Sequence, residues 1–215
     1  SALIFLIPLK YRVSEDQNKA LDMLKELGEG LAYVRKNTVI GFSLFKMFVA
    51  TSILAAISLL AISYAKEVLM IGEKNFGYLV IAAGLGMFVG MQILGRVSHF
   101  FKKSTLITLS FFLSGAALYG ISVISDIKLS LLLIFILGIC NILINSSIQT
   151  ILQSEVPQNV RGRVFGFQNM IINSAFTFPL LIFGAVADIW GIRSSIASLG
   201  IIMAFTGVIG LFGKG

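Results

Sequence analysis

The stretch VIGFSLFKMFVATSILAAISLLAISYA, residues Val39–Ala65, carries a single charged side chain over its whole length. A helix needs about 20 apolar residues to cross the hydrocarbon core of a bilayer, and this stretch is longer than that. Five more stretches of the same kind follow: Phe76–Val97, Ser104–Ser125, Leu129–Leu152, Val164–Ala187 and Ser194–Phe212. The sequence therefore predicts an all-α membrane protein with six transmembrane helices.

The bulk composition indicates the same class. Hydrophobic residues make up 57% of the chain and charged residues 13%, with a mean hydropathy of +0.94. A soluble domain of this length has no way to bury so many unbroken apolar runs. The sequence shows no cluster of metal ligands, no nucleotide-binding loop and no pairing of a nucleophile with a base. We therefore expect neither an enzyme nor a bound cofactor or metal.

The basic residues are distributed unevenly between the loops. If the loops alternate from an inner start, twelve Lys and Arg fall inside, four fall outside and Lys46 lies within a span, which accounts for all 17. The inner set is Lys10, Arg12, Lys19, Lys25, Arg35, Lys36, Arg96, Lys102, Lys103, Arg161, Arg163 and Lys214, and the outer set is Lys66, Lys74, Lys128 and Arg193. This bias predicts a protein of the lipid bilayer whose connector and C-terminus are cytoplasmic. It also argues that the net charge of +7 does not serve to bind nucleic acid.

Aromatic residues support the span boundaries. In this topology Tyr64, Tyr78, Tyr119 and Trp190 all fall near the outer interface. Tyrosine and tryptophan are enriched at that depth, where their rings face lipid and their polar atoms reach water. We therefore expect these four residues to form an aromatic belt.

The second three spans echo the first three. A shift of 89 positions lays residues 39–124 on residues 128–213, so that Phe76-Gly77 meets Phe165-Gly166 and Gly95-x-Val97 meets Gly184-x-Val186. Because each unit holds an odd number of spans, the second unit enters the membrane upside down. The sequence thus predicts two inverted three-helix repeats, which build the halves of many secondary transporters.

Residues 1–38 precede the six spans. Ala2–Leu9 is apolar but too short to span, and we interpret it as the stump of a preceding transmembrane helix. Residues 10–38 are polar, with one stripe of leucines and a charged opposite face, which predicts an amphipathic cytosolic helix. It either binds lipid head groups or packs beneath the bundle as a connector, and its mixed charge favours the connector.

Three segments resemble the major facilitator superfamily of transporters. ELGEGLAYVRKN (Glu26–Asn37) resembles its central connector, closest to the efflux-type branch that includes siderophore and macrolide exporters, and VPQNVRGRVFG (Val156–Gly166) resembles that branch's loop between spans ten and eleven. GRVSHFFKK (Gly95–Lys103) stands where the family repeats a Gly-x-x-x-Asp-Arg-x-Gly-Arg-Arg motif, with His99 at the Asp position. The resemblance implies spans seven to twelve of a bacterial inner-membrane transporter, with Gly95, Arg96, Arg161 and Arg163 in cytosolic gating loops.

One formal charge lies within a span. Lys46 is about seven residues into the first stretch, roughly 10 Å along the helix at 1.5 Å per residue. A charge at that depth is costly unless it faces water or a partner. Lys46 therefore either lines a substrate cavity or lifts its ammonium toward the inner head groups along its flexible stem.

Amide side chains form two stripes. Asn141, Asn145 and Gln149 recur every four residues on the fourth span, and Asn169, Asn173 and Thr177 do so on the fifth. Spacing by four keeps side chains on one face of a helix. We expect Asn141, Asn145, Asn173 and Thr177 to line a common aqueous cavity, the alternative being hydrogen bonds that only hold helices together.

Close helix packing is expected elsewhere. Gly86-x-x-x-Gly90 forms a small-residue face on the second span. Pro179, within the fifth span, frees a backbone carbonyl and bends the helix, either for gating or for shape alone.

Together these features predict half of a secondary active transporter that moves a small amphiphilic solute across the inner membrane by alternating access. The resemblance implies, as partners, an N-terminal six-helix half that is missing here, a small-molecule substrate, and protons exchanged during efflux. Because no span holds an Asp or Glu, we expect the proton carrier in the other half unless Lys46 takes part. Two alternatives stay open: a self-sufficient six-span permease or channel acting as an oligomer, and a non-transporting membrane scaffold or receptor.

Overall fold

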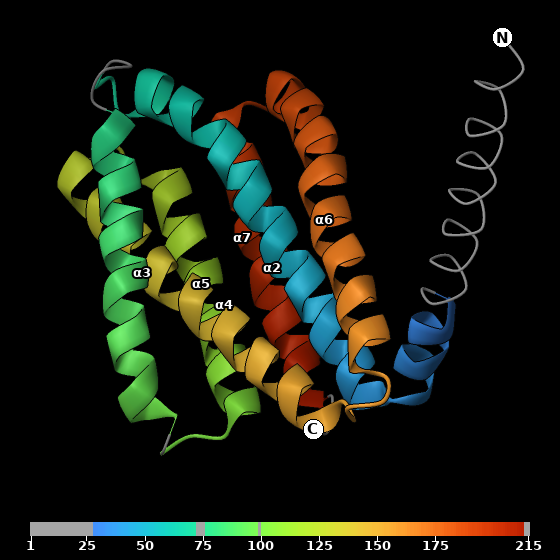
Figure 1. Cartoon of the computed structure of the whole chain (residues 1–215). Coiled ribbons are helices and arrows are strands. Elements are labelled where there is room, and N and C mark those ends of the chain that lie inside the picture. Colours follow the sequence, from blue (N-terminus) through green and yellow to red (C-terminus); the bar gives the residue numbers. More distant parts are fainter. Residues whose placement is uncertain (1–27, 72–75, 99, 213–215) are drawn as a thin grey trace, which may run out of the picture.

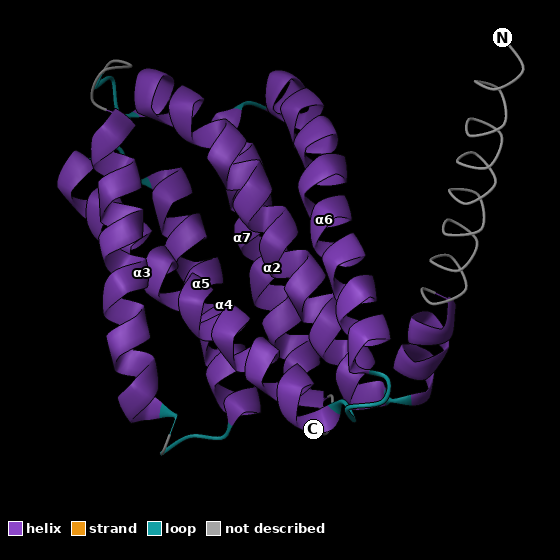
Figure 2. Ribbon diagram, in the orientation of Figure 1, coloured by secondary structure: helices purple, strands orange, loops and turns teal. Residues whose placement is uncertain are grey.

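The computed structural model describes residues 28–71, 76–98 and 100–212, which are almost entirely helical and include no strand (Figures 1 and 2). A helical segment at residues 28–36 precedes six long helices. These are α2 (Thr38–Ser63, continued by the π-helical turn η1, Tyr64–Val68), α3 (Gly77–Val97), α4 (Lys103–Val123), α5 (Ile127–Glu155), α6 (Arg161–Trp190) and α7 (Ile192–Phe212). Each is long and apolar enough to cross a bilayer, which confirms the predicted class of an all-α, multi-pass membrane protein.

Local signals fix where the helices begin and end. Asn37 caps α2, since its Oδ1 accepts from the backbone N–H groups of Val39 and Ile40, and Asp126 caps α5 through Leu129 N at 2.9 Å. Both satisfy donors that the first turn of a helix leaves unpaired. Gly191 ends α6 with φ of +78°, a conformation that glycine adopts without strain.

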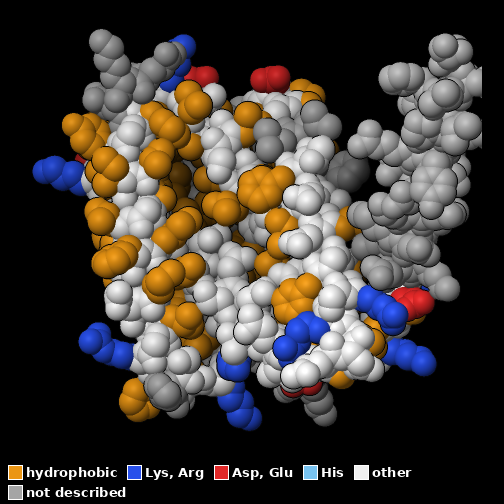
Figure 3. Space-filling view, in the orientation of Figure 1, with side chains coloured by type: hydrophobic (Ala, Val, Ile, Leu, Met, Phe, Trp, Pro, Cys, Tyr) orange, Lys and Arg blue, Asp and Glu red, His pale blue; other side chains and the backbone are white. Residues whose placement is uncertain are grey.

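The chain ends and loops divide between two ends of the bundle. The inner end, as we call it, holds the segment 28–36 and the α3–α4 and α5–α6 connections, and the outer end holds the other three connections (Figure 1). Lys102, Lys103, Arg161 and Arg163 therefore lie at the inner end, where Figure 3 shows several basic side chains. The predicted amphipathic helix is described only from residue 28, and the predicted stump at residues 1–9 lies outside the described residues.

The contacts between helices are symmetric with respect to the first three helices (α2, α3 and α4) and the last three (α5, α6 and α7). α3 packs against α5 and α6 packs against α2, while α4 packs against α7 and α2 crosses α5. Each of these pairings is converted into another, or into itself, when α2, α3 and α4 are swapped for α5, α6 and α7.

Glycines bring α3 and α5 into backbone contact. A Cβ atom at Gly86 would overlap the carbonyl of Phe135, and one at Gly138 would overlap the carbonyl of Ala83. A Cβ atom at Gly90 would overlap the side chain of Ile142 and would lie 3.0 Å from the backbone of Ile139, both on α5. The Gly86-x-x-x-Gly90 face thus lies against α5, and the opposite face of α3 is left exposed, with Leu85, Phe88 and Met91 each more than half exposed.

A second backbone contact joins α4 and α7. A Cβ at Gly115 would lie 2.8 Å from both the carbonyl oxygen of Gly200 and the nitrogen of Ala204. A Cβ at Gly200 would lie 2.9 Å from the carbonyl oxygen of Gly115. Since apolar side chains gain little by leaving lipid for protein, such close approach is the main source of helix association in a membrane.

The α3–α5 contact can be tested with Gly86→Ala. The added methyl group must push the two helices apart, which we expect to cost about 1–3 kcal/mol and to lower the melting temperature of the purified protein. The matched control is Gly84→Ala on the same helix, where a Cβ meets nothing within 4 Å and where alanine stabilises a helix by about 1 kcal/mol relative to glycine. Equal melting temperatures for the two variants would contradict the contact.

Candidate substrate cavity

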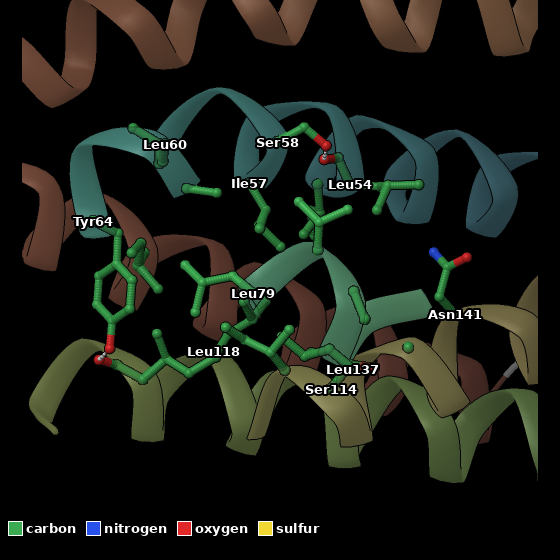
Figure 4. A pocket seen from close by; sticks show the side chains of 18 of the residues that line it. Leu54, Ile57, Ser58, Leu60, Tyr64, Leu79, Ser114, Leu118, Leu137 and Asn141 are labelled. Atoms are coloured by element: carbon green, nitrogen blue, oxygen red, sulfur yellow. Dashed lines mark hydrogen bonds between the residues drawn. The ribbon is translucent and has the colours of Figure 1, made fainter. Parts of the chain in front are cut away.

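A cavity of about 360 Å³ lies between α2 and α3, with α5 at its floor and with α4 and α7 contributing to its wall (Figure 4). α2 and α3 leave this space because each packs on other helices instead. The lining is apolar apart from Ser58, Tyr64, Ser114 and Asn141, and the described residues that form it include no charged side chain. A cavity of this size and character suits a small organic molecule.

Tyr64 closes the outer end of the cavity. It is 2% exposed, and its hydroxyl lies 3.2 Å and 3.3 Å from the carbonyl oxygens of Ile121 and Ile124 and 2.9 Å from Ser130 Oγ. These carbonyls belong to the end of α4, where a helix leaves its acceptors unpaired. The hydroxyl thereby ties α2 to α4 and α5 at the point where α2 passes into η1.

The assignment of Tyr64 to an aromatic belt was wrong, because the side chain turns into the bundle. The three other aromatic residues, Tyr78, Tyr119 and Trp190, are more than half exposed. Tyr64 lies four residues after the buried Leu60 and continues the buried face of α2 that includes Ile53 and Ala56. The π-helical turn η1 begins at Tyr64 and affects the register only of the residues that follow it.

Asn141 provides an amide group to the cavity from α5. Asn145, one turn away, donates through Nδ2 to the main-chain oxygen of Asn141 at 3.0 Å and to its Oδ1 at 3.3 Å. Asn145 itself is not among the lining residues. Of the four residues predicted to share a cavity, the structure therefore places one in the lining and a second behind it.

The stripe on α6 points elsewhere. α6 packs against α2, and the side chains of Asn173 and Thr177 are exposed on its surface, where Thr177 Oγ1 donates to the carbonyl of Asn173 at 3.1 Å. Neither residue reaches the cavity between α2 and α3. The structure thus does not bring the two stripes together into one lining.

A different amide makes the link between α5 and α6. Gln168 is 4% exposed and donates through Nε2 to Gln149 Oε1 at 2.8 Å, with Met47 Sδ of α2 at 3.3 Å. Its Oε1 is buried without a partner among the described residues. Val164, Gln168 and Ala175 are all buried. Their spacing in the sequence puts them on a second face of α6, separate from the Asn169–Thr177 stripe, and this spacing is the signal that could have identified Gln168.

Lys46 lies outside the cavity lining. Its side chain is 6% exposed, with the ammonium 5.2 Å from the centre of the Phe42 ring and close to Gly210 of α7 and Thr108 of α4. No acidic side chain pairs with it among the described residues. The ammonium is therefore enclosed between α2, α4 and α7, on the side of Lys46 that faces the inner end of the bundle.

The inner-end arginines hold helix ends in place. Arg163 forms an ion pair with Glu29 of the segment 28–36 at 2.7 Å, and Gly30 beside it lies against the carbonyl of Arg163. Arg161 donates to the carbonyls of Gln153 and Val156 at the end of α5.

The α3–α4 connection is exposed at the inner end. Arg96 is exposed in the last turn of α3, and the carbonyl of Gly95 accepts from Ser98 Oγ at 3.4 Å. His99 lies outside the described residues.

At the outer end, Arg193 donates to the carbonyls of Ser122 and Val123 and so caps the end of α4.

Six membrane-crossing helices around an apolar cavity define a membrane transport protein rather than a soluble binding domain. The chain belongs to the transporter family described as "Transmembrane secretion effector", a branch of the major facilitator superfamily, whose model matches residues 1–214. This finding agrees with the resemblance inferred from the connector and loop segments.

Individual relatives include transporters of the same superfamily. The chain is 27% identical over 155 residues to the uncharacterized MFS-type transporter YfmI of Bacillus subtilis, covering 70% of the chain and 37% of that protein. It is 24% identical over 138 residues to the multidrug efflux pump Tap of Mycolicibacterium fortuitum (64% and 34%), and 26% identical over 187 residues to macrolide efflux protein A of Streptococcus pyogenes (83% and 45%). The chain spans less than half the length of each of these relatives.

The role of Tyr64 can be tested with Tyr64→Phe. Loss of the hydroxyl leaves the terminal carbonyls of α4 and the Ser130 hydroxyl without this partner, which we expect to cost roughly 1–2 kcal/mol, measured as a lower melting temperature in detergent. Tyr119→Phe, at an exposed position on α4, is the control and should leave the melting temperature unchanged. An equal effect of the two substitutions would show that the hydroxyl does not tie α2 to α4.

Proposed function

We propose that this chain forms one six-helix half of a secondary active transporter, which exports a small amphiphilic solute by alternating access in exchange for protons. The observation that carries the proposal is the uncharged, largely apolar cavity between α2 and α3 within a chain of this transporter family. The names of two relatives, a multidrug efflux pump and a macrolide efflux protein, support export as the direction.

We also propose that residues 39–124 and 128–213 are inverted repeats. The contacts of α4 with α7 support this, because the 89-residue offset maps them onto one another. Gly115 contacts Ala204, a pair that the offset exchanges with itself, and the contact of Gly207 with Phe111 maps onto that of Gly200 with Leu118. A half-turn that relates the two units requires such pairs of equivalent contacts.

A second six-helix unit would cover the face that carries the cavity. Figure 3 shows this face as largely hydrophobic and hollowed between α3 and α2. The exposed amide of Asn173 and the hydroxyl of Thr177 on α6 would then face the second unit or a water-filled path along it, since amides turned toward lipid lose hydrogen bonds. Gly95 and Arg96 lie in the last turn of α3, and Arg161 and Arg163 lie in the first turn of α6, not in the loops as expected. They would act at helix ends that rearrange on the cytoplasmic side.

Proton coupling requires a side chain that can take up and release a proton. No described helix residue that lines the cavity is ionisable at neutral pH, so a proton carrier belongs in the second unit or at Lys46. Lys46 sits on the same helix as the cavity, one turn before Ala50, and its ammonium is enclosed. Movement of α2 relative to α7 would expose it, which is how it would join the transport cycle.

Transport is tested by producing the complete transporter in a bacterium that lacks its main efflux pumps and loading the cells with Nile red, an uncharged amphiphilic dye. We expect faster loss of the dye than in cells with the empty vector, and we expect a protonophore to abolish the difference. Asn173→Leu should slow the loss while leaving the amount of protein in the membrane unchanged. Dye loss identical to that of the empty vector would contradict the proposed function.

The proposed orientation is tested by single cysteines at the loops, since Cys140 is fully buried. On the basis of the charge bias, Lys66→Cys and Lys128→Cys should react with a membrane-impermeant maleimide added to intact cells, and Lys102→Cys and Gly162→Cys should react only after the cells are opened. Labelling of the cysteine at position 162 in intact cells would show that the orientation is the opposite of the one proposed.

A further inference from the structure

The orientation of the Asn141 amide is fixed by its neighbour. Asn145 donates through Nδ2 to the main-chain oxygen of Asn141 at 3.0 Å, and because that oxygen only accepts, Asn145 cannot turn its own Oδ1 toward it. The same Nδ2 group donates to Asn141 Oδ1 at 3.3 Å. If the Asn141 amide were reversed, two NH₂ groups would face each other with no acceptor between them.

This arrangement leaves the donor side of Asn141 free. In Figure 4 the amide nitrogen of Asn141 lies on the side of the other lining residues, and the oxygen points away from them. No described residue accepts a hydrogen bond from this nitrogen. The cavity therefore offers two N–H donors at one fixed point of an apolar wall.

Two of the other polar groups of the lining are already engaged. Ser58 Oγ donates to the carbonyl of Leu54 at 2.8 Å, and the Tyr64 hydroxyl is held by Ile121, Ile124 and Ser130. The third, the Ser114 hydroxyl, is uncharged and lies on α4, across the cavity from α2. A charged group inside this lining would find no counter-charge and would lose its hydration. An uncharged acceptor, by contrast, meets the free N–H groups of Asn141.

We infer that the cavity selects uncharged, apolar molecules that carry a hydrogen-bond acceptor, such as a ketone, ester or ether oxygen, and that Asn141 binds this acceptor. Asn145 is a positioning residue that holds the amide with its N–H groups toward the substrate. This inference rests on the proposed function, because it assigns the substrate class of the same cavity. The inference concerns recognition of the substrate, which is measured by binding, whereas the proposed function concerns its transport.

The test compares the binding of two uncharged dyes to the purified complete transporter in nanodiscs. Nile red has a carbonyl acceptor, whereas diphenylhexatriene is a hydrocarbon without one. We expect Asn141→Leu to weaken binding of Nile red about five- to tenfold, as loss of one hydrogen bond in an apolar site implies, and to leave binding of diphenylhexatriene unchanged. Asn141→Gln, which keeps the donors, should recover part of the loss, and Asn141→Asp, which replaces them with acceptors, should not.

The positioning role of Asn145 predicts non-additivity. Asn145→Ala should weaken binding of Nile red less than Asn141→Leu does, and the double variant should bind no more weakly than Asn141→Leu alone. Gln92→Leu, an amide replaced on the exposed surface of α3 away from the lining, is the control for loss of an amide as such. Size-exclusion profiles and melting temperatures identify any variant that fails to fold.

The outcomes separate the inference from the proposed function. If the unaltered protein does not bind Nile red, or if Asn141→Leu weakens both dyes equally or neither, the inference is overturned. If Asn141→Leu selectively weakens Nile red but the unaltered protein exports nothing, the inference stands and the proposed function fails. Purely additive effects of the two substitutions would remove the positioning role of Asn145.

Discussion

Backbone contact at glycines is the constraint on which the rest of this structure depends. Gly86 and Gly138 bring α3 against α5, and Gly115 and Gly200 bring α4 against α7, at distances that leave no room for a side chain. In water the hydrophobic effect would hold such helices together, but in a bilayer the lipid tails are as apolar as the side chains. The association of these helices therefore relies on close approach of their surfaces, which a single methyl group disturbs.

The cavity follows from this arrangement of pairs. α3 packs against α5, while α2 packs against α6 and crosses α5. As a result α2 and α3 diverge and leave a space between them. Two polar contacts keep α2 in position at either side of that space. Tyr64 joins it to the end of α4 near the outer end, and Met47 contacts the Gln149–Gln168 pair toward the inner end. The space is consequently part of the fold and not a gap between loosely placed helices.

The sequence predicts the spans well, because a long apolar run without charges has few other structures available to it in a membrane. It predicts the site less completely, because periodicity places residues on one face of a helix but does not say which way that face turns. Of the first stripe only Asn141 reaches the cavity, whereas the Asn173 stripe is exposed on the surface of α6. The burial of Val164, Gln168 and Ala175 on another face of α6 decides the second case. Tyr64 escaped prediction for a related reason: its place near an interface suggested exposure, although it continues the buried positions Ala56 and Leu60 of α2.

The central claim is that the space between α2 and α3 is the place through which substrate moves. Ser58→Cys puts a thiol of nearly the same size as the native hydroxyl into this lining, and Ser154→Cys puts one at an exposed position near the inner end of α5. The most direct measurement is Nile red export before and after a small maleimide reacts with each thiol, with and without prior addition of the dye. We predict that modification at position 58 blocks export and that the dye slows this modification, while modification at position 154 does not block export and is not slowed by the dye. Full export after complete modification at position 58 would contradict the central claim.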